Sequence, residues 1–463
     1  MGAASAEPLA SPQAIAEALA RHVGGRRWII ATDHAAMLGP FVSWLRDNGA
    51  EGVLIVASTR GVGDLPDADI VYASIGRHDS QMAAIRAHSA AIADPAPEVA
   101  AAVDRFDPDG SALVVASPFE TLQEALGRRV SGARRPAWVA LEDKTTVHAL
   151  WAEAGITTAD HMVVPVAEAA AAARELAGPL GTVWAADNTE GWHGGAEYTR
   201  WVPRPADVSA AVAWFTGRSR TVRVMPFLNG IPCSIHGFVT ATGTAAFRPW
   251  EMVILRRRDP AGFAYAGGAS FWDPPRTGRE EMRAAARAVG DVLRRRVDYR
   301  GPFSIDGVMT ADGFRPTELN PRLSAGFSAQ AQASELSIGS LVRAYLDEAL
   351  DLDPVWLEEA IVGPADRRRT SAVRLPLLGA DPFEADPVGL RIDGPRAVEA
   401  PEQPVATLRA GPVQSGVLLM LQLDPDRVDA GPSVAPLVAA AAVFARDRWD
   451  LSVPDLVPAP DLR

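Results

Sequence analysis

The segment from Gly301 to Arg322 constrains the fold more than any other part of this chain of 463 residues. Two runs with strand character flank the turn Ala311-Asp312-Gly313. The turn predicts a β-hairpin with a three-residue loop whose glycine is left-handed, a favoured connection. Such a loop pairs Thr310 with Phe314 and sets the register of the whole hairpin.

That register brings two acids together on one face. Asp306 lies opposite Glu318, and Asn320 follows on the same face because side chains alternate along a strand. Opposed like charges destabilise a sheet, whereas Mg²⁺ binds such oxygen ligands and shares them with phosphates. We therefore predict a metal site at Asp306, Glu318 and Asn320 for Mg²⁺, with Mn²⁺ as the alternative. A solvated polar face is the other interpretation, and a bulge at Pro316 would shift the register.

Composition restricts the function. The net charge of −12 argues against a dedicated nucleic-acid binder, which needs a basic surface. The single cysteine, Cys233, excludes a disulfide framework. No run approaches the roughly 20 apolar residues that span a bilayer, and the N-terminal residues lack the pattern of a secretory signal. We expect a cytoplasmic protein without a membrane partner, and the length predicts two to four domains.

Lysine usage singles out one position. Lys144 is the only lysine, and all other strongly basic side chains are arginine. Wherever a planar guanidinium suffices, this chain uses it, so Lys144 marks a place where a compact ammonium is needed.

Two motifs resemble a known family. Glu318-Leu319-Asn320-Pro321-Arg322 resembles the E-x-N-P-R signature of the ATP-grasp superfamily, which includes biotin carboxylase and carbamoyl-phosphate synthetase. Asp306 matches the upstream metal-binding aspartate of that family. Glu142-Asp143-Lys144, followed by a helix and Ala154-Gly155-Ile156, is similar to the element whose lysine reaches ATP phosphates. The resemblance covers roughly residues 141 to 330.

The resemblance implies a carboxylate-amine ligase. ATP lies between two α+β subdomains, a substrate carboxylate becomes an acylphosphate, and an amine displaces phosphate to form an amide. Lys144 and Arg322 are then the catalytic residues, Lys144 on the ATP phosphates and Arg322 on the carboxylate or acylphosphate. The implied partners are a small carboxylic acid and an amine, such as an amino acid or short peptide. A kinase on the same scaffold and a non-catalytic nucleotide-binding regulatory protein are the alternatives.

The sequence departs from the family pattern near the nucleotide. The family has a second lysine on the strand before its Gly-rich loop, and this chain has none there. Arg200 or Arg223 is a candidate to supply the charge, and Trp184 is a candidate to stack on adenine or to belong to the core. Gly194 and Gly195 end a Gly-rich turn that we expect to close over the phosphates with its backbone N–H groups.

The remaining predicted contacts follow in sequence. The expected adenine hinge contains Met225, Phe227 and Leu228. The predicted substrate residues are Arg248 and Arg256, whose positive charges suit an acidic substrate, and Glu251, which is expected to assist the metal or the amine.

Alternating strand and helix patterns predict an α/β, Rossmann-like pre-ATP-grasp domain over residues 1–135. An ATP-grasp lid subdomain (136–222) and a central subdomain with the metal site (223–350) follow, both α+β. A Pro-rich stretch from Val362 to Pro404 is expected to set off a C-terminal α+β segment (351–463). This segment is predicted to complete the acceptor pocket or to form a homodimer contact.

Overall fold

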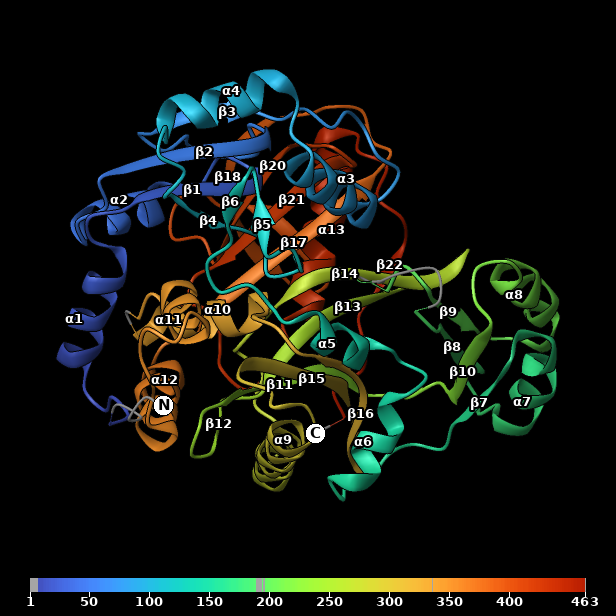
Figure 1. The fold of residues 1–463 in the computed structure, drawn as a ribbon. Coiled ribbons are helices and arrows are strands. Elements are labelled where there is room, and N and C mark those ends of the chain that lie inside the picture. Colours follow the sequence, from blue (N-terminus) through green and yellow to red (C-terminus); the bar gives the residue numbers. More distant parts are fainter. Residues whose placement is uncertain (1–6, 189–193, 195, 335, 463) are drawn as a thin grey trace.

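The computed structural model describes residues 7–188, 194, 196–334 and 336–462. Three larger β-sheets and one two-stranded sheet organise these residues. The N-terminal sheet lies at the top of Figure 1, the small sheet at the right and the large sheet through the centre. Within the described residues, no helix is both long and apolar enough to cross a bilayer.

The N-terminal sheet is parallel, with strand order β3-β2-β1-β4, as the Rossmann-like prediction requires. Its central strands are almost continuous runs of buried aliphatic residues because helices cover both faces. Its strands are β1 (Arg27–His34), β2 (Gly52–Thr59), β3 (Asp69–Tyr72) and β4 (Leu113–Val115). Its helices are α1 (Pro12–Val23), α2 (Gly39–Asp47), α3 (Gln81–Ala93) and α4 (Pro97–Phe106), and a short ribbon of β5 (Glu124–Ala125) and β6 (Arg128–Arg129) follows.

A short connection leads from this unit into the small sheet. It contains α5 (Pro136–Val139), η1 (Ala140–Glu142) and α6 (Val147–Glu153). The helix expected before Ala154-Gly155-Ile156 is α6, which buries Val147, Leu150 and Trp151. Gly155 adopts φ 68° just after it, a conformation that ends helices.

The small sheet is antiparallel, in the order β7-β10-β8-β9, and two helices cover one of its faces (Figure 1). Its strands are β7 (Met162–Pro165), β8 (Thr182–Ala186), β9 (Thr199–Val202) and β10 (Thr221–Pro226). The helical segments are η2 (Val166–Glu168), α7 (Ala169–Leu176), η3 (Pro205–Asp207) and α8 (Val208–Phe215).

The large sheet has 12 strands along the order β16-β15-β11-β13-β14-β17-β21-β20-β18-β19, with β12 and β22 off this path. The first part comprises β11 (Ile231–Val239), β12 (Thr244–Ala246), β13 (Trp250–Arg258), β14 (Ala261–Ala269), β15 (Gly301–Thr310) and β16 (Gly313–Asn320). The C-terminal part comprises β17 (Ser371–Leu378), β18 (Ala385–Asp393), β19 (Arg396–Glu399), β20 (Ala406–Val413), β21 (Gly416–Leu423) and β22 (Leu456–Val457). Helices α9 (Arg276–Val297), α10 (Ala325–Ala331), α11 (Ile338–Leu346), α12 (Pro354–Arg367) and α13 (Ala435–Trp449), with η4 (Gln332–Ser334), pack against it.

The prediction that the Pro-rich stretch from Val362 to Pro404 separates the C-terminal segment is therefore wrong. Residues 362–404 contain the end of α12 and strands β17, β18 and β19. Strand β17 pairs with β14 through Gly267 and Val373, so the C-terminal strands continue the sheet that carries the predicted metal site.

The hairpin turn is shorter than predicted, but the register at the acids is as predicted. Thr310 pairs with Gly313 across a two-residue turn, and not with Phe314. A bulge between Asp306 and Gly307 then adds one residue to the second strand, and Asp306 is again opposite Glu318. The two deviations cancel. The bulge forms beside Pro316, which has no N–H to give to the ladder.

Candidate functional site

The predicted metal ligands converge on one face of the hairpin. Asn320 Nδ2 donates to Asp306 Oδ2 at 2.9 Å, and Glu318 is the cross-strand partner of Asp306. Burial, and then the Glu318 carboxylate, raise the pKa of the Asp306 carboxyl. The pair is thus held at an electrostatic cost that a bound cation would relieve.

Lys144 faces the same carboxylates. Its Nζ lies 2.8 Å from Glu318 Oε1, and its side chain is only 13% exposed. The turn before α6 positions it, since Asp143 Oδ1 accepts from the backbone N and the hydroxyl of Thr145 at 2.8 and 2.6 Å. Asp143 Oδ2 also accepts from the N–H of Asn188, at the start of the segment that contains the Gly-rich turn.

Arg223 occupies the place of a second cation. It pairs with Ala185 across β10 and β8, which puts it on the sheet face opposite the covering helices. Its Nη1 donates to the carbonyl oxygens of Thr317, at 2.5 Å, and Lys144, at 3.2 Å. Burial lowers its pKa to about 10, and the carboxylates of Glu318 and Asp143 oppose that shift. Arg223 therefore supplies a second positive charge beside the predicted metal ligands, although the chain has no second lysine.

The other candidates on this sheet point away from the site. Trp184 is fully buried, stacks on Phe215 of α8, and donates to Thr182 Oγ1 at 2.9 Å. Its proposed contact with adenine is wrong, because alternation along β8 directs the ring into the helix-covered core. Arg200, opposite Trp184, stacks on Trp214 with its guanidinium carbon 3.6 Å from the ring centroid, so it is not the replacement charge.

Of the Gly-rich turn, the described residue Gly194 lies near Lys144. Gly194 is buried and lines a small pocket together with Lys144 and Asn188. Gly195 lies outside the described residues. Glu197, three residues further on, accepts from both terminal nitrogens of Arg86 in α3, at 3.0 and 2.9 Å. This ion pair links the segment before β9 of the small sheet to the N-terminal unit.

The predicted adenine hinge joins the small and large sheets. Met225 is buried in β10, and Phe227 and Leu228, both half-buried, connect β10 to β11. Phe227 lies 5.0 Å from the ring of Trp201. The guanidinium of Arg256 covers Phe227 at 4.8 Å, so the structure places this predicted substrate residue at the hinge.

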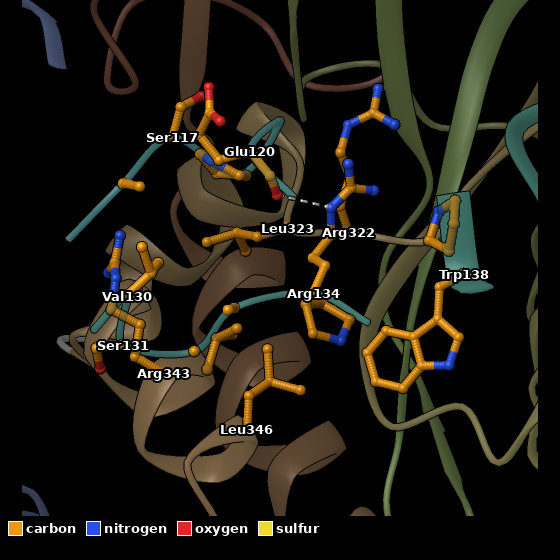
Figure 2. Close-up of a pocket in the computed structure, with 18 of the residues that line it drawn as sticks. Ser117, Glu120, Val130, Ser131, Arg134, Trp138, Arg322, Leu323, Arg343 and Leu346 are labelled. Atoms are coloured by element: carbon orange, nitrogen blue, oxygen red, sulfur yellow. Dashed lines mark hydrogen bonds between the residues drawn. The ribbon is translucent and has the colours of Figure 1, made fainter. Parts of the chain in front are cut away.

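Arg322 lies in a second region, where the N-terminal unit meets the large sheet. Glu142 Oε1 is 2.6 Å from Nη1 of both Arg322 and Arg134, and all three side chains are largely buried. Figure 2 shows Arg134 and Arg322 next to each other in a pocket of about 530 Å³, which includes solvent-open space. Glu120 and Ser117, which follow β4, line the same pocket.

Two predicted substrate residues have structural partners instead. Arg248 is 1% exposed, and its two terminal nitrogens bind Asp273 and Asp366. Glu251, equally buried, accepts from Ser433 Oγ at 2.5 Å and from the backbone N of Val434 at 2.9 Å, at the start of α13. Both predictions are wrong because packed elements, α12 and α13, cover these side chains.

Two polar residues of the large sheet were not identified by the sequence reasoning. Tyr265 of β14 is 41% exposed, and the charges of Asp306 and Arg322 both act on it. Arg374 of β17 is exposed and also acts on Tyr265. Strand alternation could have put both on the polar face, but no local pattern connects strands more than 100 residues apart.

The donor set suits a hard divalent cation. It contains two carboxylates and one amide oxygen, and the described residues contain no group of three or more His, Cys, Asp or Glu side chains that could hold a metal ion by themselves. A cation here would need further ligands from a substrate, which is how Mg²⁺ binds with phosphates. Lys144 and Arg223 lie where such phosphates would need positive charge.

The sequence matches no protein-family profile and no curated protein. Solved structures nevertheless match nearly the whole chain. The biotin carboxylase domain of Hydrogenobacter thermophilus 2-oxoglutarate carboxylase, solved with MgADP and bicarbonate, has a TM-score of 0.55 at 11% identity, covering 93% of this chain and 96% of its own. Biotin carboxylase from Campylobacter jejuni has a TM-score of 0.53 at 13% identity, covering 95% and 94%.

The ADP complex of N5-carboxyaminoimidazole ribonucleotide synthetase has a TM-score of 0.51 at 14% identity, covering 92% of this chain and 98% of its own. At these identities the similarity establishes the fold. The predicted combination of a Rossmann-like N-terminal domain with an ATP-grasp fold is confirmed.

Proposed function

From the ATP-grasp fold, we propose that this chain is an ATP-dependent ligase that joins a carboxylic acid to an amine and releases ADP and phosphate. The observation that carries the proposal is the convergence of Lys144, Glu318, Asp306 and Asn320, which come from segments more than 150 residues apart. Two structural neighbours of this fold were solved with ADP or MgADP, which supports a nucleotide beside these residues.

The first step is phosphoryl transfer. An oxygen of the donor carboxylate attacks the γ-phosphorus of ATP, the bond to the β,γ-bridging oxygen breaks, and ADP leaves. Lys144 and Arg223 neutralise the phosphates and hold them in line, which is most of what this reaction requires. Asp306, Glu318 and Asn320 would hold Mg²⁺, which supplies charge neutralisation when bound.

The second step forms the amide. The amine nitrogen attacks the acyl carbon, the carbon–oxygen bond to phosphate breaks, phosphate leaves with the bonding pair, and the nitrogen loses a proton. Arg322 would bind the donor carboxylate and then the acylphosphate with its planar fork. Glu142 fixes the orientation of that guanidinium, with Nη1 2.6 Å from its Oε1.

The rival functions make different predictions. A kinase on this scaffold would stop at a phosphate ester, and a regulatory protein would bind ATP without turnover. The missing second lysine was the reason to consider the regulatory alternative. Arg223 weakens that reason because it brings a cation to the same site.

Hydroxylamine trapping tests the proposal. The purified chain is incubated with MgATP, hydroxylamine and a panel of carboxylic acids that includes the twenty amino acids, and hydroxamate and ADP are measured. A ligase gives hydroxamate with at least one acid, in an amount equal to ADP, and none in the Lys144→Ala variant. A phosphate ester without hydroxamate would favour the kinase. Tight ATP binding without ADP release across the panel would favour the regulatory protein.

A further inference from the structure

Arg134 is buried, and each nitrogen of its guanidinium donates to an acceptor of the protein. Nη1 donates to Glu142 Oε1 at 2.6 Å, Nη2 to the carbonyl oxygen of Phe119 at 3.0 Å, and Nε to the carbonyl oxygen of Glu120 at 3.4 Å. Both carbonyl groups belong to the loop that follows β4. Arg134 is therefore held by the N-terminal unit, and its hydrogen bonds do not leave it placed to bind a substrate itself.

Arg322 shares the same carboxylate oxygen. Its Nη1 lies 2.6 Å from Glu142 Oε1, the atom that also accepts from Arg134. Its guanidinium carbon lies 4.7 Å from the centroid of the Phe119 ring, within the range of a cation–π contact. Figure 2 shows the two arginines next to each other in the pocket that both line. The N-terminal unit thus contacts Arg322 directly through Phe119 and indirectly through Glu142.

The charges of this cluster give Arg134 a role beyond anchoring. Two guanidinium groups share one carboxylate, which leaves one positive charge in excess. Without Arg134, the carboxylate of Glu142 would cancel the charge of Arg322 and would repel any carboxylate that approaches Arg322. Both effects are strong in a buried site, where water screens little. Because Arg134 neutralises Glu142, Glu142 can orient Arg322 without reducing its attraction for an anion.

We propose that Arg134 and Phe119 are positioning residues for the donor carboxylate, and that both act through Arg322. Phe119 supports the guanidinium from one side, and Arg134 neutralises the Glu142 carboxylate that orients it. The N-terminal unit then completes the donor site from outside the ATP-grasp motifs. This inference rests on the proposed ligase function, which assigns the donor carboxylate to Arg322. A purely structural Arg134 is the alternative, and it predicts a loss of stability without a specific loss of donor binding.

The test varies charge and hydrogen bonding separately. Arg134→Gln removes the charge, whereas Arg134→Lys keeps it and loses the fork that spans three acceptors. The double variant Arg134→Gln/Glu142→Gln removes the carboxylate as well and restores one positive charge in excess. Phe119→Leu removes the ring but keeps an apolar side chain at a half-buried position. Arg135→Gln is the matched control, since Arg135 is the next residue and its ion pair is exposed.

Hydroxamate formation with the best donor gives kcat and the KM for the donor and for ATP, and thermal unfolding gives the Tm. Arg134→Gln should raise the KM for the donor about tenfold or more, with the KM for ATP within about twofold of the wild type. The double variant should lower the donor KM at least about threefold from that of Arg134→Gln. Arg134→Lys should keep it within about threefold of the wild type, although its Tm falls.

The last two variants address the ring and the specificity of the effect. Phe119→Leu should raise the KM for the donor about two- to fivefold, because a cation–π contact is lost. Its half-buried side chain makes it a test that does not depend on whether Arg134→Gln folds. Arg135→Gln should behave like the wild type in every measurement.

A lower Tm with an unchanged donor KM in Arg134→Gln would make Arg134 purely structural and overturn the inference. The same conclusion would follow from a double variant no better than Arg134→Gln, or from a donor KM raised more than about threefold in Arg134→Lys. An unchanged donor KM in Phe119→Leu would remove the ring from the proposed site. Absence of hydroxamate with every acid in the wild type would instead refute the ligase function, and both positioning roles would fall with it.

Discussion

Replacement of Glu251 tests most directly whether this side chain has a structural role or binds substrate. The sequence predicts that it contacts substrate, whereas in the structure its carboxylate accepts from Ser433 Oγ, Val434 N and Ala435 N. Replacement by alanine removes the acceptor from a buried helix start. Ala435 N has Ser433 Oγ as a second acceptor at 3.2 Å, so chiefly two donors lose their partner.

The cost follows from those contacts. A buried donor without a partner costs about 1–3 kcal/mol, so the loss of two such partners in Glu251→Ala should cost about 2–6 kcal/mol. Unfolding entropy grows with chain length, and for a chain of this size about 3 kcal/mol corresponds to roughly 3 °C in Tm if all parts unfold together. Differential scanning calorimetry measures the shift. Kinetics at 20 °C should show the KM of every substrate within twofold of the wild type.

The same residue has a pH signature. Burial raises the pKa of Glu251 from 4.5 to about 7 in the folded chain, and the hydrogen bonds oppose this. Between those values the folded protein holds a proton that the unfolded chain has lost, so this contribution to stability falls as pH rises from about 4.5 to 7. Glu251→Gln mimics the protonated form, and its Tm should gain on that of the wild type over this range.

Two results would refute the reasoning. One is a Glu251→Ala variant with unchanged Tm and a raised KM, which would return Glu251 to substrate binding. The other is a difference in Tm between Glu251→Gln and the wild type that does not change between pH 5 and 8.

Three further outcomes are expected. Lys144→Arg should lower kcat/KM for ATP at least 100-fold in an ADP-release assay with unchanged Tm, because the planar guanidinium does not replace a compact ammonium beside Glu318; near-wild-type activity would contradict this. Trp184→Phe should lower the free energy of unfolding by about 1–2 kcal/mol, because it leaves a cavity and loses one hydrogen bond. Thermal unfolding measures this loss, and the KM for ATP should stay unchanged. A raised KM would support the prediction that Trp184 contacts adenine. Arg86→Ala should raise the KM for ATP two- to fivefold, because Glu197 loses its ion pair near Lys144 and Gly194. Unchanged steady-state kinetics would show that this ion pair does not contribute to nucleotide binding.

Local chemistry determined the most specific part of the site. In a hairpin, the two strands follow each other directly, so the opposition of Asp306 and Glu318 depends on one turn and one register. Although the turn was predicted one residue too long, the bulge beside Pro316 restored the same pairing. Lys144 was identified because it is the only lysine in the sequence, and its Nζ lies 2.8 Å from Glu318 Oε1.

Tertiary structure decided everything that depends on what covers a residue. Alternation tells which residues share a face of a strand, but it does not tell what packs on that face. Trp184 therefore faces helices, and Glu251 binds Ser433, 182 residues further along the chain. Arg248 binds Asp366, 118 residues away, as well as the nearer Asp273. Strand β17 likewise joins the large sheet through β14, a pairing between residues about 100 positions apart. Such pairings are long-range, and no local pattern carries them.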